Sequence, residues 1–348
     1  MRIRTISLKM RRPGMDRTVE NRVYLAGGKC GRLFDLDGND PTKEQLMKVF
    51  VTGATGFIGS AIVPELIKAG HQVLGLTRSD GGAASLKAAG AEVQQGSLED
   101  LDSLRSGASK SDGVIHCAFN NDFSKFKETN ELEGRVIAAL ADVLAGSERP
   151  LVITSVAAMG SPSPGKLATE DYFDPSQPKP RSATENAAAA AADRGVIVSV
   201  VRLPQVHNIM KQGIVTRLIQ IARAKGVSAY VSGGLNRWAA GHLLDVAHLY
   251  RLVLEKHEGV LEKPRAVARY HAVGEEGVPL RLIAETIGKG LGVPTAGLSQ
   301  EEAQAHFGPL AMFVGADMSA SSQQTQEWLG WNPNRPGLIE DLQQTQYS

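Results

Sequence analysis

The chain has 348 residues, of which 42% are hydrophobic and 22% charged, and its net charge at pH 7 is +1. This is the composition of an ordinary globular protein with one large or two moderate domains. The near-neutral charge gives no indication of a nucleic-acid-binding or anionic-surface-binding protein, and no apolar run approaches the roughly 20 residues that a membrane span needs. Only Cys30 and Cys117 are cysteines, which indicates a reducing compartment without a disulfide framework, and no metal-ligand spacing is present.

Residues 1–46 differ from the rest of the chain. They hold ten Lys and Arg against six Asp and Glu, a net +4, and show no clear hydrophobic periodicity. We expect an unstructured extension before a folded part that starts at Met47. A mitochondrial presequence is the alternative, favoured by the basic start and opposed by the acidic residues near position 37. The expected location is therefore cytoplasmic, with mitochondrial as the alternative.

The most informative stretch is residues 49–59, VFVTGATGFIG. Its first four residues are β-branched or aromatic, as in a buried strand. Gly53, Gly56 and Gly59 follow, and the chain continues at once into an amphipathic helix. Glycine lets backbone N–H groups approach a phosphate closely, and a helix N-terminus adds partial positive charge. A strand, a glycine turn and a helix in this order predict a site for a dinucleotide pyrophosphate.

Strands and helices alternate after this motif. Further strands are expected at 72–77, 92–95, 113–117, 151–154 and 196–202. Helical periodicity starts at Ile58 and recurs at 83–89, from 99, at 128–145 and at 183–193. Past Pro204 the pattern loosens, with helices at 215–224, 244–255, 280–291, 300–307 and one closing near Trp331, and short strands at 229–232 and 268–273.

Such alternation predicts βαβ units and an α/β fold, a doubly wound parallel sheet of Rossmann type with a smaller C-terminal α/β substrate lobe. The domain boundaries that we expect are an extension at 1–46, a dinucleotide-binding domain at 47–206 to which 240–275 returns, and a smaller lobe from 207–239 and 276–345.

The residues that follow the expected strand at 72–77 indicate whether the cofactor is NADP or NAD. Arg78 offers a planar cation suited to the 2′-phosphate of NADP, whereas a carboxylate there would suit the ribose hydroxyls of NAD. Asp80 lies two residues further on and keeps NAD possible. A solvated loop arginine is the alternative interpretation.

Five segments resemble the extended short-chain dehydrogenases/reductases, the epimerase/dehydratase superfamily. They are the nucleotide loop at 51–59 (VTGATGFIG), the fourth-strand segment at 114–118 (VIHCA), the catalytic-serine segment at 153–160 (ITSVAAMG), the segment over the nicotinamide at 202–206 (RLPQV) and the C-terminal motif at 329–333 (LGWNP). The resemblance implies cofactor contacts from Gly53, Thr55, Gly56, Phe57, Ile58, Gly59, Arg78, Ser97, Leu98, Ala118, Phe119, Pro204 and Val206.

The chain departs from this family at the residues that move protons. Family members use Tyr-x-x-x-Lys about 25 residues after the serine, which here is Ser155. Counting forward places Arg181 at the tyrosine position and Glu185 at the lysine position. Arginine does not release its proton near neutral pH, and glutamate cannot lower a neighbouring pKa by charge. The chain therefore resembles atypical members that keep the glycine loop and lack the pair.

Three residues remain candidates for catalysis. Arg181 could bind a substrate carboxylate or carbonyl oxygen, Glu185 could act as an acid or base if buried, and Ser155 could hydrogen-bond a substrate carbonyl. Alternatively, Arg181 and Glu185 form a helix salt bridge at i,i+4 spacing and Ser155 caps a turn. Tyr172 could replace the missing phenol or pack on its own loop.

The remaining polar residues are weaker candidates. His116 and Cys117 are expected in the core, and His207 with Asn208 could line the pocket. Asp245 is expected to cap a helix, and His242 to reach the substrate or support its loop.

Two functions follow from these residues. The first is an oxidoreductase-like enzyme that holds NADP, or NAD, and exchanges hydride with a carbonyl or hydroxyl group of a small organic substrate, with epimerase or dehydratase chemistry as a variant. The alternative is a protein that binds NAD(P) without turnover and reports redox state to a partner. We expect a monomer or homodimer, without nucleic acid, membrane or metal.

Overall fold

The computed structural model describes residues 22–24, 33–35, 46–120, 126–179, 181–257 and 267–347. The chain forms two compact units, Met1–Leu46 and Met47–Ser348. In the first, β1 (Arg22–Tyr24) pairs antiparallel with β2 (Leu33–Asp35), where the sequence indicated no regular structure. The rest of the expected extension lies outside the described residues.

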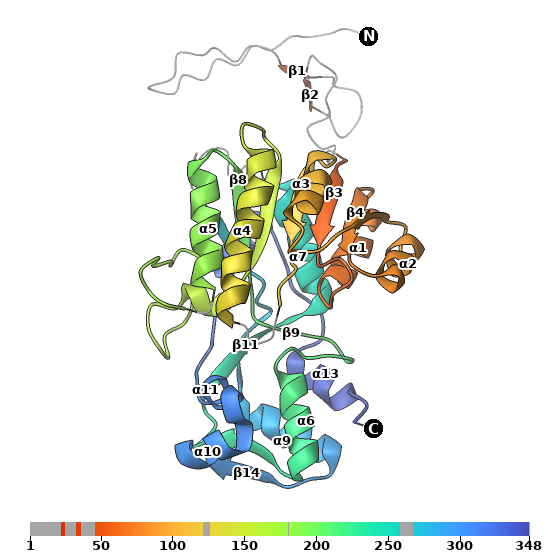
Figure 1. Ribbon diagram of the computed structural model, residues 1–348. Helices are drawn as coiled ribbons and strands as arrows, with labels where there is room; N and C mark the ends of the chain where they lie inside the picture. Colours follow the sequence, from red (N-terminus) through yellow and green to blue (C-terminus); the bar gives the residue numbers. More distant parts are fainter. Residues whose placement is uncertain are drawn as a thin grey trace. The chain divides into compact units, whose positions relative to one another are not determined.

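The second unit is built on a seven-stranded parallel sheet in the order β12-β8-β7-β6-β3-β4-β5 (Figure 1). Its strands are β3 (Lys48–Thr52), β4 (Gln72–Thr77), β5 (Glu92–Gln95), β6 (Gly113–His116), β7 (Pro150–Val156), β8 (Ile197–Leu203) and β12 (Ala268–His271). All of these pairings are parallel, so the predicted Rossmann-type sheet is confirmed.

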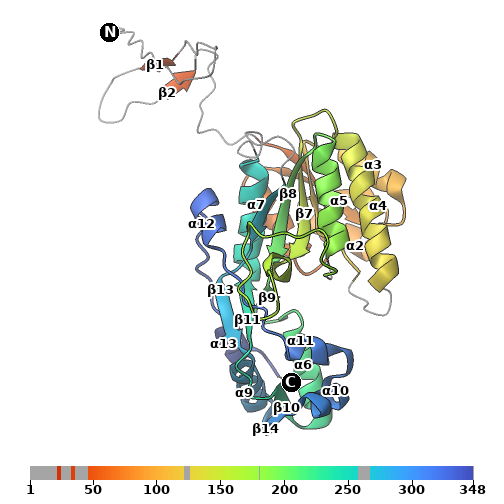
Figure 2. The same ribbon diagram turned by 90° about the vertical axis from the view of Figure 1, so that its left-hand side faces the viewer.

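Helices cover both faces of this sheet (Figure 2). On one face lie α1 (Gly59–Lys68) and α7 (Leu243–Glu255), and on the other α3 (Leu101–Ser109), α4 (Phe126–Leu144) and α5 (Ser182–Asp193); α2 (Asp80–Ala88) follows β4. Strand β3 shows why both faces need cover. Val49 and Val51 pack into the core beneath α1 and α7, while Phe50 packs into the core beneath α3, α4 and α5. Side chains alternate across a strand, so a wholly apolar strand is buried on both faces.

The strand order reverses at β3. The chain runs from β3 outward to β4 and β5, then returns to the other side of β3 as β6. In doubly wound sheets a crevice opens outside the carboxyl ends of the strands at such a reversal, and ligands bind there. The glycine turn after Thr52 lies at this point.

A third core lies below the sheet in both views. It joins α6 (Val215–Lys225), α9 (Leu280–Leu291), α10 (Gln300–Phe307), α11 (Ala311–Val314) and α13 (Leu338–Gln344) with β10 (Ser228–Val231), which pairs with β14 (Thr295–Leu298). A separate three-stranded sheet contains β9 (Gln205–His207), β11 (Arg237–His242) and β13 (Glu275–Pro279). The domain boundaries at 206, 239 and 275 stay predictions.

The sequence prediction was incomplete in this second half. It missed β9, β11, β13 and β14, which have three to six residues each. It also placed the last helix near Trp331, whereas α12 (Gln323–Leu329) ends earlier and α13 follows it. Short strands carry too few residues for a period of two to stand out.

Candidate functional site

Close backbone packing builds the glycine turn. Gly53 has a φ of 69°, a conformation that favours glycine, and a Cβ on it would lie 2.7 Å from the amide nitrogen of Ala118. The Gly56 N–H donates to the Gly53 carbonyl at 2.9 Å. A Cβ on Gly59 would lie 2.8 Å from Cα of Ala54 and nearer still to the carbonyl oxygen of Gly53. The turn thus holds the start of α1 directly against the ends of β3 and β6.

The surface of this turn suits a phosphate group. Thr55 and Gly56 are exposed, while Phe57 and Ile58 are half-buried. Ile58 precedes α1 and offers no side-chain cap, so among the described residues no side chain caps the first N–H groups of this helix. Uncapped N–H groups and the positive end of a ten-residue helix are features that favour anion binding, so the pyrophosphate site at this turn stays a prediction.

The other predicted cofactor residues lie at the same edge of the sheet. Arg78 is exposed at the end of β4, and Ser97 with Leu98 follows β5. A hydrogen bond from Ser97, and to a smaller extent the charge of Arg78, lowers the pKa of Glu99, so both side chains lie near one carboxylate. The side chain of Leu98 packs against the core instead.

Two further groups of predicted cofactor residues flank this edge. Ala118 and Phe119 follow β6, and Pro204 lies between β8 and β9. Val206 is buried in the core, which leaves only its backbone to meet a ligand.

Ser155 lies near the carboxyl end of β7 and is only 1% exposed. Its hydroxyl donates to Oε1 of Glu185 on α5 at 2.8 Å. Glu185 is fully buried. Arg202 donates hydrogen bonds to both of its carboxylate oxygens, one from Nε and one from a terminal nitrogen, at 2.8 Å each. Arg269 of β12 adds a hydrogen bond at 2.9 Å. Burial alone would raise the pKa of Glu185, but the two arginines outweigh it and lower that pKa. The carboxylate is therefore ionised at neutral pH.

Arg181 belongs to a second buried network. It immediately precedes α5 and donates from one terminal nitrogen to Glu133 of α4 at 3.1 Å and to the carbonyl of Thr154 at 2.6 Å. Glu133 also contacts Nε2 of His116 at 3.2 Å, and Nδ1 of His116 lies 2.6 Å from the Thr52 hydroxyl. A chain of polar contacts therefore runs from the glycine turn to Arg181.

The guanidinium of Arg181 has two further features. It lies over the ring of Phe119, 3.6 Å from the ring centroid, at the end of β6. Its Nε is buried and has no hydrogen-bond partner among the described residues. A buried donor without an acceptor costs about 1–3 kcal/mol, so this nitrogen is the atom at which an oxygen of a ligand would be stabilising.

The salt bridge considered between Arg181 and Glu185 is therefore not the arrangement found. Arg181 has a φ of −119° outside the helix and pairs with Glu133, while Glu185 pairs with Arg202 and Arg269. An i,i+4 pair requires both residues within one regular helix. Each residue instead has partners on other elements.

Sequence reasoning missed Glu133, Arg202 and Arg269 as members of the site. One signal was present: Glu133 falls on the apolar face that continues through Ile137 and Leu140, where the helical period calls for a hydrophobic residue. A charge at a core position needs a buried partner. The sequence does not say which partner.

Tyr172 occupies a loop position before α5. Its hydroxyl accepts a hydrogen bond from Gln177 at 2.9 Å, and the Lys179 ammonium lies 5.2 Å from its ring centroid. Both partners belong to the same loop, in accord with the packing role considered for Tyr172.

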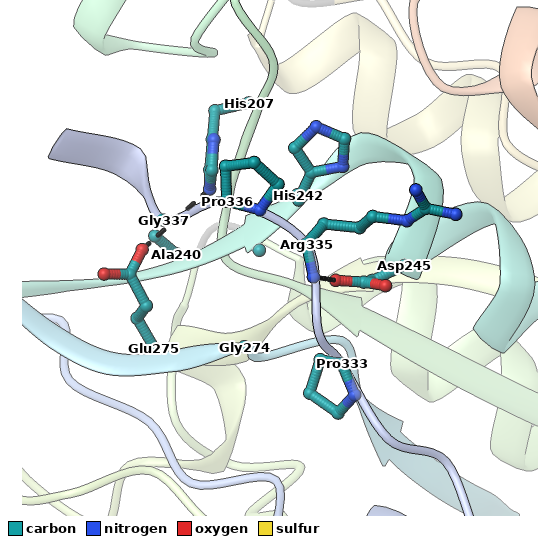
Figure 3. A pocket seen from close by; sticks show the side chains of 11 residues that line it. His207, Ala240, His242, Asp245, Gly274, Glu275, Pro333, Arg335, Pro336 and Gly337 are labelled. Carbon is teal, nitrogen blue, oxygen red and sulfur yellow. Dashed lines mark hydrogen bonds and ion pairs between the residues drawn. The ribbon is translucent and has the colours of Figure 1, made fainter. Parts of the chain in front are cut away.

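His207 and His242 border a different, small pocket (Figure 3). Its cavity volume is about 30 Å³, and it is also lined by Asp245, Glu275 and Arg335. His207 is buried, with Nδ1 2.6 Å from Asp341 of α13, and burial lowers its pKa to about 4. None of the predicted cofactor residues borders this pocket.

The assignment of Asp245 as a helix cap was wrong. His242 caps α7 by accepting the N–H of Leu244 at 3.2 Å, while Asp245 lies within the first turn. Asp245 instead accepts the Arg335 N–H at 3.0 Å.

The doubly wound sheet and its glycine turn define a dinucleotide-binding protein. Residues 49–267 match the NAD dependent epimerase/dehydratase family, and the chain belongs to this family. An uncharacterized protein of Schizosaccharomyces pombe is 48% identical over 302 residues, which cover 86% of this chain and all of that protein.

Solved structures of the same superfamily share the fold. The human epimerase family protein with NADPH has a TM-score of 0.63 at 20% identity and covers 86% of this chain and 99% of its own. The UDP-glucose 4-epimerase of Thermus thermophilus with NAD has a TM-score of 0.62 at 20% identity, with the same two coverages. The chain thus has an NAD(P)-binding fold, with neighbours that bind NAD or NADPH.

Membrane-spanning helices and metal-binding groups can be assessed only in the described parts of the chain. Within them, no helix is both long and apolar enough to cross a bilayer. Nor do His, Cys, Asp and Glu side chains there gather into a group of three or more that could hold a metal ion.

Proposed function

We propose that the protein is an NADP-dependent oxidoreductase that exchanges hydride with a carbonyl or hydroxyl group of a small organic substrate. The observation that carries the proposal is the buried Arg181 guanidinium. It lies over Phe119 with an unpaired Nε, and its terminal nitrogen binds the carbonyl of the residue before Ser155. The Arg181 guanidinium thereby lies beside the residue that follows the end of β6 and against the backbone next to Ser155.

The chain supplies binding and orientation. The turn at residues 53–59 and the start of α1 would hold the pyrophosphate, and Arg78 the 2′-phosphate. The nicotinamide, when bound, supplies hydride chemistry. Arg181 and Ser155 would orient the reacting oxygen, and Glu185 would position Ser155. Because Glu185 is held ionised, it is no proton donor at neutral pH, which leaves Tyr172 or water as the source. The cytoplasmic location and the monomeric or homodimeric state stay predictions.

A panel of aldehydes, ketones and quinones tests the activity through NADPH absorbance. Oxidation of NADPH by any of them supports the proposal. Tight NADPH binding without turnover of any compound contradicts it and favours a protein that binds the cofactor without catalysis.

Replacing Arg181 with lysine is expected to lower kcat/KM by about 10²-fold, because one preorganised donor to a developing oxyanion contributes on that scale. Lysine keeps a positive charge opposite Glu133 but removes Nε. The control is Arg194→Lys at the other end of α5, where the arginine pairs with Asp142 on the surface. Unchanged kcat/KM in the Arg181 variant would show that the site assignment is wrong.

Replacing Arg78 with alanine is expected to reduce the preference for NADP over NAD by at least about tenfold, because a charge-assisted hydrogen bond to phosphate contributes about 1.5–3 kcal/mol. Fluorescence titration with both dinucleotides measures the ratio. Lys87→Ala, in the last turn of α2, is the control. An unchanged ratio would remove Arg78 from the cofactor site.

A further inference from the structure

We propose that Lys211, in the connection between β9 and α6, binds the pyrophosphate of the dinucleotide. This inference rests on the proposed function, whose cofactor it requires, and adds to the cofactor site a residue from a distant part of the chain. It follows from the position of the Lys211 ammonium, from the connection that carries it, and from the charges around it.

The Lys211 side chain reaches the glycine turn. Its ammonium lies 5.3 Å from the centroid of the Phe57 ring, a contact that is itself stabilising. Phe57 is part of the turn, directly after the exposed Thr55 and Gly56, and α1 begins two residues later at Gly59. Lysine carries its charge on a flexible four-carbon stem, so from this position the ammonium can move onto a phosphate held by the N–H groups of the turn.

Hydrogen bonds hold the connection between β9 and α6 in place. The Asn208 side chain accepts the N–H groups of Met210 and Lys211 at 2.9 Å each, and the Asn208 N–H donates to the Lys211 carbonyl at 2.9 Å. The buried Gln212 donates to the Asn208 carbonyl at 2.9 Å and to the Thr345 hydroxyl at 3.0 Å. The backbone of Lys211 is therefore already ordered, and a ligand has only the side chain left to immobilise.

The charge of Lys211 is available to a ligand. The side chain is exposed, and its ammonium has no carboxylate partner within the described residues. Residues 53–59 contain no charged side chain, so the turn itself does not repel an anion. A phosphate at the turn would meet the positive end of α1 and the Lys211 ammonium together.

Lys211 and Arg78 come from opposite sides of the central strand. Arg78 follows β4, which pairs with one edge of β3, whereas Lys211 follows β9, which continues from β8 on the other side of β3. A dinucleotide spans such a reversal of strand order, with its pyrophosphate at the helix N-terminus. Arg78 would then distinguish NADP from NAD, and Lys211 would bind the group that both cofactors share.

Isothermal titration calorimetry with NADP, NAD and ADP-ribose tests this assignment. All three carry the pyrophosphate, and ADP-ribose lacks both the nicotinamide and the 2′-phosphate. Lys211→Gln is expected to weaken each of them about tenfold, because a charge-assisted contact with phosphate is lost, and to leave the ratio of NADP to NAD affinity unchanged. Added NaCl should weaken binding to wild type more than binding to the variant, because salt screens an exposed charge. Lys211→Arg keeps the charge and should retain most of the affinity.

Lys68→Gln is the matched control, because it removes one exposed positive charge from the other end of α1. It should change each dissociation constant by less than about twofold. The inference is overturned if Lys211→Gln leaves the binding of any of the three ligands unchanged, if it alters the ratio of NADP to NAD affinity, or if Lys68→Gln weakens binding as much. The proposed function is tested separately, by NADPH absorbance. Binding that depends on Lys211 without turnover of any compound would contradict the proposed function and leave this inference standing.

Discussion

Replacing Glu185 with glutamine is expected to lower the free energy of unfolding by about 3–5 kcal/mol, because removing one partner of a buried ion pair leaves the other charge uncompensated. Glutamine keeps one oxygen that can accept from the fully buried Arg202, but it carries no negative charge, and its NH2 group would face a second donor of Arg202. The other polar partners of Arg202 are the carbonyls of Thr169 and Tyr172 and the ring of His271. Arg269 would lose the same carboxylate. Urea unfolding followed by circular dichroism measures the difference between variant and wild type.

The control for this change is Glu148→Gln, which alters an exposed glutamate in the loop before β7 and should shift stability by less than about 0.5 kcal/mol. The pH dependence gives a second readout. The folded-state pKa of Glu185 lies below its ordinary value of 4.5, so its contribution is present above that pH and is lost as the pH falls through the folded pKa. The difference in the free energy of unfolding between wild type and variant should therefore decrease at acidic pH. If this difference stays constant or increases as the pH falls, Glu185 is not ionised in the folded protein.

Replacing Gly59 with alanine is expected to weaken NADP binding at least about tenfold and to lower stability by about 1–3 kcal/mol, the usual cost of overpacking. The added Cβ would overlap the backbone of Gly53 and Ala54, which cannot move aside as a flexible side chain would. The start of α1 must therefore shift away from β3, and the N–H groups that would hold the pyrophosphate shift with it. Fluorescence titration and urea unfolding measure the two effects.

Gly134→Ala provides a control of opposite sign. Gly134 lies within α4, and a Cβ on it would meet no atom within 4 Å. Alanine in a helix interior is favoured over glycine by about 1 kcal/mol, so this variant should gain stability and keep its NADP affinity. If Gly59→Ala and Gly134→Ala had the same NADP affinity, the packing of the glycine turn would not govern cofactor binding.

The first half of the fold could be predicted from the sequence because most of its strands are rich in buried apolar residues and alternate with helices. Each expected strand up to residue 202 appears within two residues of its expected ends. Except in β5, whose residues are half-buried or exposed, burial on both faces appears in the sequence as runs rich in Val, Ile and Leu. Strand β9 has only three residues, and β13 has five of which one is buried, so no local pattern marks them.

The sequence by itself determined the sheet and the glycine turn, and it singled out Ser155, Arg181 and Glu185 as candidate site residues. Backbone conformation and apolar periodicity are local properties, so neighbouring residues encode them. Only the tertiary structure decided what those residues do to one another. Glu133 and Arg181 are 48 residues apart in the sequence, and Arg269 and Glu185 are 84 residues apart. A charged residue at a core position indicates that a buried partner exists, but the sequence does not indicate which residue it is. The direction of the Ser155 hydrogen bond depends on the ionisation of Glu185, which Arg202 and Arg269 impose only once three elements have packed together.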